Sequence, residues 1–156
     1  VAFAHTEIAK LQAILESSDQ LLAGEIGVSE VYRRMIFNEV YDRINMGSFN
    51  FINAVFQDLF FRIPTEDEYD QSFSIIEYNQ SGYLFNQNVQ TKTAYVEILT
   101  STPEFYEGLI RGAFASFLAE SPEPVVLDQM LTDFYTTEDW PAVLRQLMAS
   151  DAYANF

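Results

Sequence analysis

The stretch from Ser48 to Tyr69, SFNFINAVFQDLFFRIPTEDEY, constrains the fold more than any other part of the chain. Large apolar residues recur there at i, i+4, i+7, i+8 and i+11, the spacing of one face of an α-helix. Pro64 stops this helix because its ring cannot continue the hydrogen-bond ladder. Thr65 and Glu68 have the spacing of a capping box, so a second helix begins at once. The residues of the apolar face are Ile52, Phe56, Leu59, Phe60 and Ile63.

Helical spacing continues along the rest of the chain, and few segments alternate apolar and polar residues with period two. A first apolar face lies on the segment 6–22, and a second runs from Ser29 to Ile44 as one helix. We therefore predict an all-α fold, a compact bundle of about six to seven helices. The first face consists of Ile8, Leu11, Ile14, Leu15 and Leu22, and the second of Val31, Met35, Ile36, Val40 and Ile44.

The chain contains an internal repeat. Segment 56–60 matches 114–118, which places Pro64 on Pro122 at an offset of 58 residues; segment 95–105 matches 143–153 at an offset of 48. The ten-residue difference is about the length of an Asn- and Gln-rich insertion at 78–92. We predict two tandem helix–Pro–helix–helix units that pack against each other, since one unit cannot bury its own aromatic face.

This repeat predicts the domain organisation. Residues 1–156 are expected to form a single helical domain with an N-terminal helical pair (1–47), a first unit (48–105) and a second unit (106–156). Four phenylalanines on the two leading helices should be mostly buried. They are Phe56, Phe60, Phe114 and Phe117.

Composition limits the classes of partner. With 8 basic and 23 acidic residues the net charge is −15, which repels phosphate backbones and anionic membrane surfaces. No apolar run is long enough to cross a bilayer, and no cysteine is present. We expect a soluble protein, cytoplasmic or extracytoplasmic, that binds no nucleic acid and does not insert into membranes. Because the sequence starts at Val1, without Met or a signal-peptide pattern, we expect a mature or excised piece.

No catalytic or metal-binding constellation is visible in the sequence. His5 is the single histidine, and no nucleophile elbow or glycine-rich phosphate loop occurs. The carboxylates at 66, 67, 68 and 70 lack the glycine-punctuated spacing of a calcium loop, and complementing the helix dipole explains them better. We therefore predict no enzyme activity, no metal site and no cofactor.

Two features are candidates for binding. Arg62 lies in an apolar run before the Pro64 corner, where its guanidinium can satisfy helix-end carbonyls or recognise a ligand. Glu39 and Asp42 are expected to face Arg62 or Arg111 as ion pairs. The segment 78–92 is predicted to be a loop with a short strand-like stretch. Its aromatic residues, Tyr78, Tyr83 and Phe85, either contact a protein or carbohydrate or fold back as a plug between the two units.

The corner Phe60-Phe61-Arg62-Ile63-Pro64, the acidic helix start after it, and the closing segment Ser101-Thr102-Pro103-Glu104-Phe105 carry a family resemblance. Over about residues 32–105 the chain resembles the helical domain of phycobilisome linker polypeptides and related helical modules of large bacterial surface proteins. That pattern has a Leu-Gly-Arg-x-Pro corner, so Phe61 replaces its glycine, and the second unit has no arginine at the matching corner. The basic character usual in linkers is also absent here.

The resemblance implies a protein that contacts other proteins and does not catalyse. We expect a non-enzymatic helical interaction or scaffold module of a larger bacterial assembly or surface protein, with a protein partner. The alternative is a small-molecule or glycan binding domain with its site at the junction of the two units. The predicted binding residues are Tyr78, Tyr83, Phe85 and Arg62.

Overall fold

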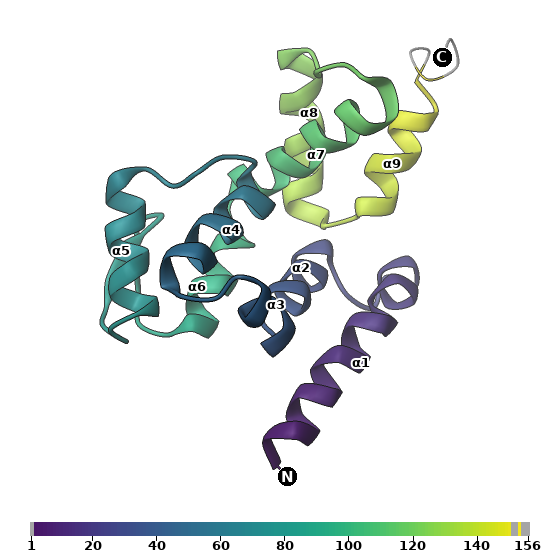
Figure 1. The fold of residues 1–156 in the computed structure, drawn as a ribbon. Helices are drawn as coiled ribbons and strands as arrows, with labels where there is room; N and C mark the ends of the chain where they lie inside the picture. Colours follow the sequence, from purple (N-terminus) through teal and green to yellow (C-terminus); the bar gives the residue numbers. More distant parts are fainter. Residues whose placement is uncertain (1, 151–152, 154–156) are drawn as a thin grey trace.

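The computed structural model describes residues 2–150 and 153 and confirms a mostly helical fold (Figure 1). In this part of the chain nine α-helices and one β-hairpin occur, in the order α1 (Ala2–Leu22), α2 (Val28–Ile36), α3 (Glu39–Ile44), α4 (Ser48–Phe60), α5 (Glu66–Ile76), β1 (Gly82–Leu84), β2 (Gln87–Val89), α6 (Lys92–Leu99), α7 (Pro103–Leu118), α8 (Pro124–Thr137) and α9 (Trp140–Met148). Among these helices, none combines the length and apolar character needed to span a membrane.

The number of helices exceeds the predicted six to seven, partly because the run from Ser29 to Ile44 is not one helix. Asn38 separates α2 from α3: its Nδ2 donates to the carbonyls of Arg34 and Met35, and its Oδ1 accepts from the Tyr41 backbone N–H. One buried amide thus ends one helix and caps the next. The turn rotates α3 away from the expected face, which leaves Val40 and Ile44 exposed; Met35, at the end of α2, is exposed as well.

The helices after α3 can be grouped as α4–α5–α6 and α7–α8–α9, with α7 beginning at Pro103, inside the range 48–105 expected for the first unit. In each unit the first helix ends at a residue with positive φ, Phe61 at 57° and Ala119 at 51°, followed by the proline corner. The first unit alone carries the β-hairpin between its second and third helices. Helices α4 and α7 pack against each other, so the leading helices of both units meet at the centre (Figure 1).

Helix α4 forms the middle of the hydrophobic core. Six of its residues are buried, and Val55, Phe56 and Leu59 are completely inaccessible. Ile63, by contrast, is exposed because the helix already ends at Phe60. The expectation for α7 is also wrong in part: Phe114 is half-buried and Phe117 is 40% exposed. The buried stripe of α7 instead follows its residues 105, 109, 110 and 113.

A polar cluster joins the N-terminal helices to both units. Ser29 Oγ donates to Glu138 Oε2 over 2.7 Å, and Tyr106 OH donates to Glu138 Oε1 over 2.6 Å. Arg33 donates from Nη2 to Ser29 Oγ and from Nε to Thr100 Oγ1, each over 3.0 Å. Burial, and then the hydrogen bond to Glu138, raise the pKa of Tyr106. The cluster connects α2, the end of α6, α7 and the residue that ends α8.

The central place of α4 predicts the response to a truncation. Phe56→Ala should lower the free energy of unfolding by about 3–5 kcal/mol, because it removes a fully buried ring and leaves a cavity. Phe117→Ala, on a partly exposed ring, should cost only about 1 kcal/mol. Urea unfolding followed by circular dichroism measures both. Equal losses for the two variants would contradict the observed core.

Candidate functional site

The four predicted binding residues do not form one site. Tyr78 follows α5 and is 60% exposed, and Tyr83 on β1 is 54% exposed. Phe85 lies at the hairpin turn and packs on the Phe60 ring, with 5.7 Å between the ring centroids. Arg62 lies in the corner between α4 and α5. The structure therefore separates an internal pair, Phe85 and Arg62, from two exposed tyrosines.

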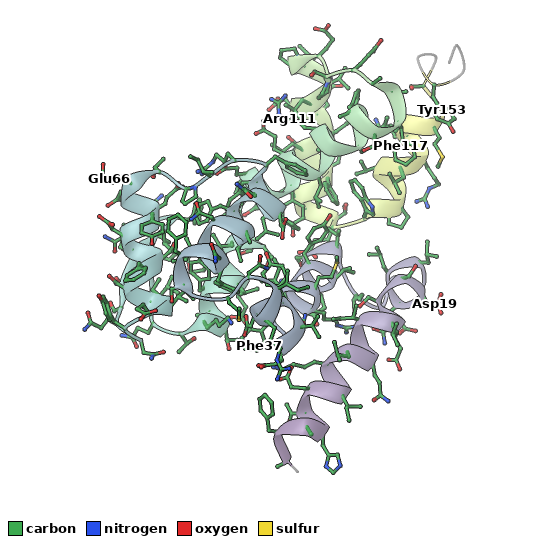
Figure 2. All side chains as sticks on the ribbon, in the orientation of Figure 1. Asp19, Phe37, Glu66, Arg111, Phe117 and Tyr153 are labelled. Atoms are coloured by element: carbon green, nitrogen blue, oxygen red, sulfur yellow. The ribbon has the colours of Figure 1, made fainter. Side chains whose placement is uncertain are left out.

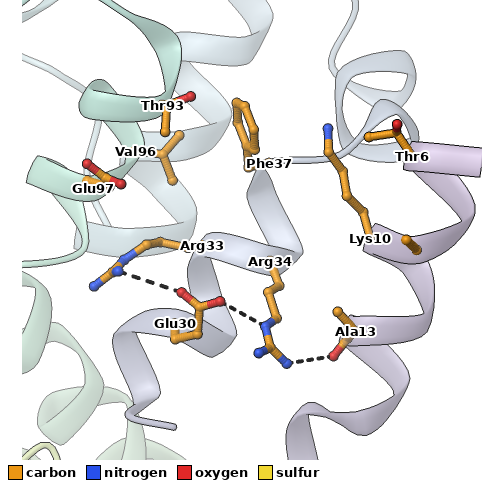
Figure 3. A pocket seen from close by; sticks show the side chains of 11 residues that line it. Thr6, Lys10, Ala13, Glu30, Arg33, Arg34, Phe37, Thr93, Val96 and Glu97 are labelled. Atoms are coloured by element: carbon orange, nitrogen blue, oxygen red, sulfur yellow. Dashed lines mark hydrogen bonds and ion pairs between the residues drawn. The ribbon is translucent and has the colours of Figure 1, made fainter. Parts of the chain in front are cut away.

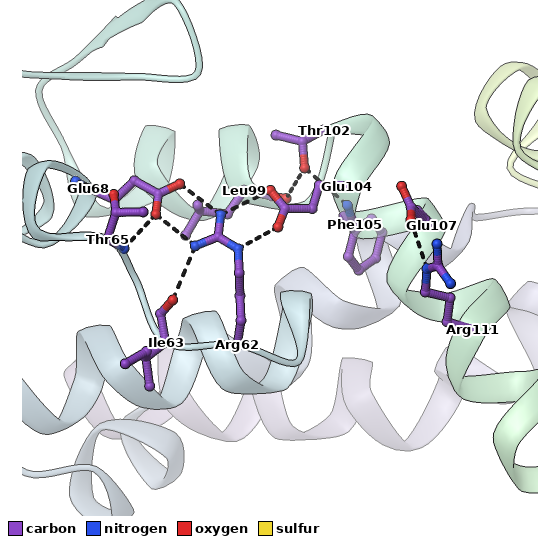
Figure 4. A network of polar contacts seen from close by, with 10 residues as sticks. All are labelled: Arg62, Ile63, Thr65, Glu68, Leu99, Thr102, Glu104, Phe105, Glu107 and Arg111. Atoms are coloured by element: carbon purple, nitrogen blue, oxygen red, sulfur yellow. Dashed lines mark hydrogen bonds and ion pairs between the residues drawn. The ribbon is translucent and has the colours of Figure 1, made fainter. Parts of the chain in front are cut away.

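Arg62 uses all five of its N–H groups inside the protein (Figure 4). Nε and Nη2 donate to the two oxygens of Glu104 over 2.6 and 3.0 Å. Nη1 and Nη2 donate to the two oxygens of Glu68 over 2.7 and 2.8 Å, and Nη1 also reaches the carbonyl of Ile63 over 3.1 Å. The guanidinium therefore ties the end of α4 to the first turns of α5 and α7 and has no N–H left for a ligand.

These contacts shift the charges at the corner. The hydrogen bonds from Arg62 hold the pKa of Glu68 below its usual 4.5, a shift that burial opposes and the Thr65 backbone N–H strengthens. The same bonds, to Glu68 first and then to Glu104, raise the pKa of Arg62. The guanidinium also lies near the Phe56 ring, with 5.4 Å from Cζ to the ring centroid. Charge and aromatic contact together make this a fixed structural element.

The predicted ion pairs of Arg62 and Arg111 with α3 are wrong. The carboxylates of α3 bind other cations, and Arg111 is captured by a carboxylate one turn away on its own helix. The observed pairs are Arg43 with Glu39 at 2.9 Å, Lys92 with Asp42 at 2.5 Å, and Arg111 with Glu107 at 2.7 Å.

The segment 78–92 packs partly into the core, through residues that the sequence analysis did not single out. Leu84 and Val89 at the two ends of the hairpin are buried in the core. A Cβ at Gly82 would come within 2.7 Å of the Gln71 carbonyl oxygen, so the strand lies directly on α5. Phe85 and Asn86 both have positive φ, the geometry of a type I′ turn. The alternation of buried and exposed residues is confined to β1, which is too short for the sequence to reveal.

Tyr78 belongs to an exposed group of four rings, Phe49, Tyr69, Phe73 and Tyr78, which we call the aromatic row. Neighbouring rings have centroids 5.8, 5.8 and 5.4 Å apart. Phe49 and Tyr78 at the ends are 63% and 60% exposed, and the middle two are half-buried. Figure 2 shows the side chains around α5, whose first residue is Glu66. A contiguous, half-open strip of aromatic surface on rigid helices is suited to binding a partner.

A hydrogen bond holds the two ends of this surface together. Ser48, the first residue of α4, donates to Glu77, which directly follows α5. The start of α4 is thereby tied to the end of α5, and Phe49 is kept beside Tyr69. The sequence analysis gave no binding role to Phe49, Tyr69 or Phe73. The four-residue spacing of Tyr69 and Phe73 was the available signal.

Two of the hollows in the described part of the chain are relevant to binding, and neither is lined by residues of the aromatic row. The junction pocket, about 300 Å³, lies between the hairpin turn, the α6–α7 corner and α8. The N-terminal cleft, about 500 Å³, lies between α1, α2 and α6 (Figure 3). The junction pocket is lined by Phe85, Asn86, Gln87, Ile98, Ser101, Thr102, Pro103, Glu104 and Tyr135.

The cations of the N-terminal cleft are already paired. Lys10 lies 2.7 Å from Glu7. Arg34 lies 2.9 Å from Glu30 (Figure 3). Arg33 also faces Glu30, at 3.6 Å. The cleft therefore has little free positive charge to attract an anion. Within residues 2–150 and 153, no three His, Cys, Asp or Glu side chains gather in a way that could hold a metal ion.

No family model, curated protein or solved structure matches this chain. The resemblance to phycobilisome linkers consequently stays a prediction, and the function must be argued from the aromatic row and the junction pocket.

The Arg62 contacts predict a pH-dependent stability difference. Arg62→Gln should lower the free energy of unfolding by about 2 kcal/mol near neutral pH, allowing for partial solvent exposure. Because the Glu68 pKa is depressed in the folded protein, the stabilisation is present above 4.5 and is lost as the pH falls through the folded value. Urea unfolding over a pH series should therefore show the difference shrinking in acid.

Arg111→Gln is the matched control, since Arg111 makes an exposed pair within one helix. It should cost less than about 0.5 kcal/mol at every pH. A gap between wild type and Arg62→Gln that is unchanged well below pH 4.5 would show that Glu68 does not carry the effect.

Proposed function

We propose that this chain is a non-enzymatic protein-interaction module, acting within a larger bacterial assembly or surface protein, and that the aromatic row contacts its protein partner. The observation that carries the proposal is the contiguity of the four rings of that row on α4, α5 and the residues just after α5. Aromatic side chains are enriched at the cores of protein interfaces, because they offer a large contact area at low conformational cost.

Rigidity supports this role. The inner half of the row packs on the core, so Tyr69 and Phe73 lose little freedom on binding. The Ser48–Glu77 hydrogen bond and the Arg62–Glu68 contacts fix both ends of α5 relative to α4. A preformed surface of this kind needs no rearrangement to receive a partner.

Charge defines the class of partner. Helix α5 carries Glu66, Asp67 and Asp70, all exposed, and the whole chain has a net charge of −15. An apolar strip beside carboxylates is complementary to a protein surface with an apolar centre and a basic rim. Such complementarity increases the association rate and makes binding sensitive to salt.

Site-specific photocrosslinking tests the proposal. With p-benzoylphenylalanine at position 78, irradiation in cells of the source organism should join the chain to one protein of defined mass. Position 83 is the matched control, because Tyr83 is an exposed aromatic residue outside the row. Phe49→Ser should reduce the adduct at position 78 by removing the other end of the row. Equal adducts at 78 and 83, or none at 78, would contradict the proposal.

The junction pocket supports a second candidate, a small-molecule or glycan binding domain. It combines two aromatic side chains, Phe85 and Tyr135, with the amides of Asn86 and Gln87 and the carboxylate of Glu104. A small number of convergent polar groups beside aromatic walls is typical of ligand pockets.

Saturation-transfer NMR with a panel of neutral mono- and disaccharides tests this candidate. A sugar that occupies the pocket should show saturation transfer that Tyr135→Ala abolishes, because that ring forms one wall. Tyr83→Ala, outside the pocket, should leave the signal unchanged. The absence of transfer for every sugar, or a signal indifferent to Tyr135→Ala, would count against glycan binding.

A further inference from the structure

Helix α1 leaves most of the aliphatic residues of its predicted apolar face exposed. Ser17 is the one buried residue among those of α1 that the structure describes. Leu15 is 81% and Leu22 71% exposed, and Ile8 and Leu11 are exposed as well. These are four of the five residues whose spacing marked the apolar face of this helix in the sequence. The helix lies at the edge of the molecule (Figure 1).

Polar contacts hold the opposite face of α1 to α2. Arg34 Nη1 donates to the Ala13 carbonyl over 2.9 Å (Figure 3). It also donates to Ser17 Oγ over 3.2 Å and to Gln20 Oε1 over 2.7 Å. Glu7 accepts from a backbone N–H at the start of α3. Leu21 also packs against the core, and Ser18 and Leu22 border a hollow of about 400 Å³ against α9. The side chains of Ile8, Leu11 and Leu15 remain exposed.

The outward face has the spacing of a coiled-coil seam. Its residues recur at intervals of four and three, the a and d positions of a heptad, over almost the whole helix. None of them is charged, although the chain carries −15. We call this face the outer seam. It consists of Ala4, Ile8, Leu11, Leu15, Ser18 and Leu22.

The outer seam is complementary to itself when one copy is reversed. A two-fold axis near the middle of the helix places Ala4 opposite the partner's Leu22, Ile8 opposite the partner's Ser18, and Leu11 opposite the partner's Leu15. Small residues then face large ones at both ends, and two leucine layers fill the centre. A two-fold interface needs such a self-complementary patch.

Charge complementarity favours the same arrangement. The position flanking the seam on one side is occupied by His5, Gln12 and Asp19. In the reversed register His5 lies beside the partner's Asp19, and Gln12 lies near its own copy at the axis. In a parallel register Ala4 would meet Ala4 and Ser18 would meet Ser18, which leaves voids, and His5 would have no carboxylate partner.

We propose that the outer seam of α1 binds the α1 helix of a second copy of this chain in an antiparallel pair. The N-terminal helix then serves assembly, and the aromatic row lies on other elements, α4 and α5, where it stays open in the dimer. The self-pairing does not depend on the proposed function, because it involves none of the residues that carry that function.

Sedimentation velocity over micromolar to near-millimolar concentrations tests the proposal. The wild type should approach twice the chain mass of 17.9 kDa. Leu15→Glu should hold the protein at 17.9 kDa with an unchanged circular dichroism spectrum, since that side chain is exposed in the single chain. Ile44→Glu is the control, because Ile44 on α3 is 75% exposed and lies outside the seam. A wild type that stays monomeric throughout, or dimers that survive Leu15→Glu, would overturn the proposal.

Cysteine crosslinking tests the register, because the chain has no cysteine of its own. Ile8→Cys and Ser18→Cys proteins, mixed and oxidised, should form a mixed disulfide dimer. Each variant alone should form little, since ten helical residues put its own copies about 15 Å apart, beyond the reach of a disulfide. Crosslinking of each variant with itself in preference to the mixture would establish a parallel pair and refute the antiparallel one.

Discussion

The structure depends on one arginine that lies between three helices. After α4 the chain has to leave the helix, turn at a proline and start α5, while α7 begins beside this corner. Arg62 satisfies this geometry with a single planar group, because its N–H fork binds one carboxylate at the start of α5 and another at the start of α7. Both carboxylates, Glu68 and Glu104, are also favoured there by the helix dipoles. The first unit, its proline corner and its junction with the second unit are therefore fixed at the same point.

The binding surfaces follow from what this packing leaves uncovered. Helix α4 turns its large residues into the core except at its first turn, where Phe49 emerges beside α5. The β-hairpin lies on α5 and buries Leu84 and Val89 in the core, whereas Tyr78 and Tyr83 are exposed aromatic residues of the same segment. The aromatic row therefore consists of residues on α4 and α5 together with Tyr78, the first residue of the 78–92 segment. The two helices that carry it are already fixed by their packing in the core.

Much of the fold could be predicted from the sequence, because helix punctuation is local. The Thr65 capping box and the proline corners are determined by residues that are neighbours in the sequence, and both are confirmed. Periodicity was less informative about direction: it marks an apolar face without saying what covers it. For that reason Phe117 was placed correctly on a helix but wrongly expected to be buried. Leu15 was placed correctly on an apolar helix face, but the sequence did not show what covers that face. The partners of Arg62 lie 6 and 42 residues away, and a contact over 42 residues has no signature in local spacing.

The two proline corners share a backbone but differ in what their left-handed residue does. Ala119 at φ 51° has a short side chain, so a glycine there would relieve backbone strain at little loss of packing. Phe61 at φ 57° instead rests its ring on α7, where a Cβ at Gly108 or Gly112 would come within 3.2 or 3.3 Å of it. The strained backbone of the first corner thus holds the Phe61 ring against Gly108 and Gly112 of α7. The second unit could therefore exchange its left-handed residue for glycine and relieve the strain. In the first unit the same exchange would remove the Phe61 ring from its contact with α7.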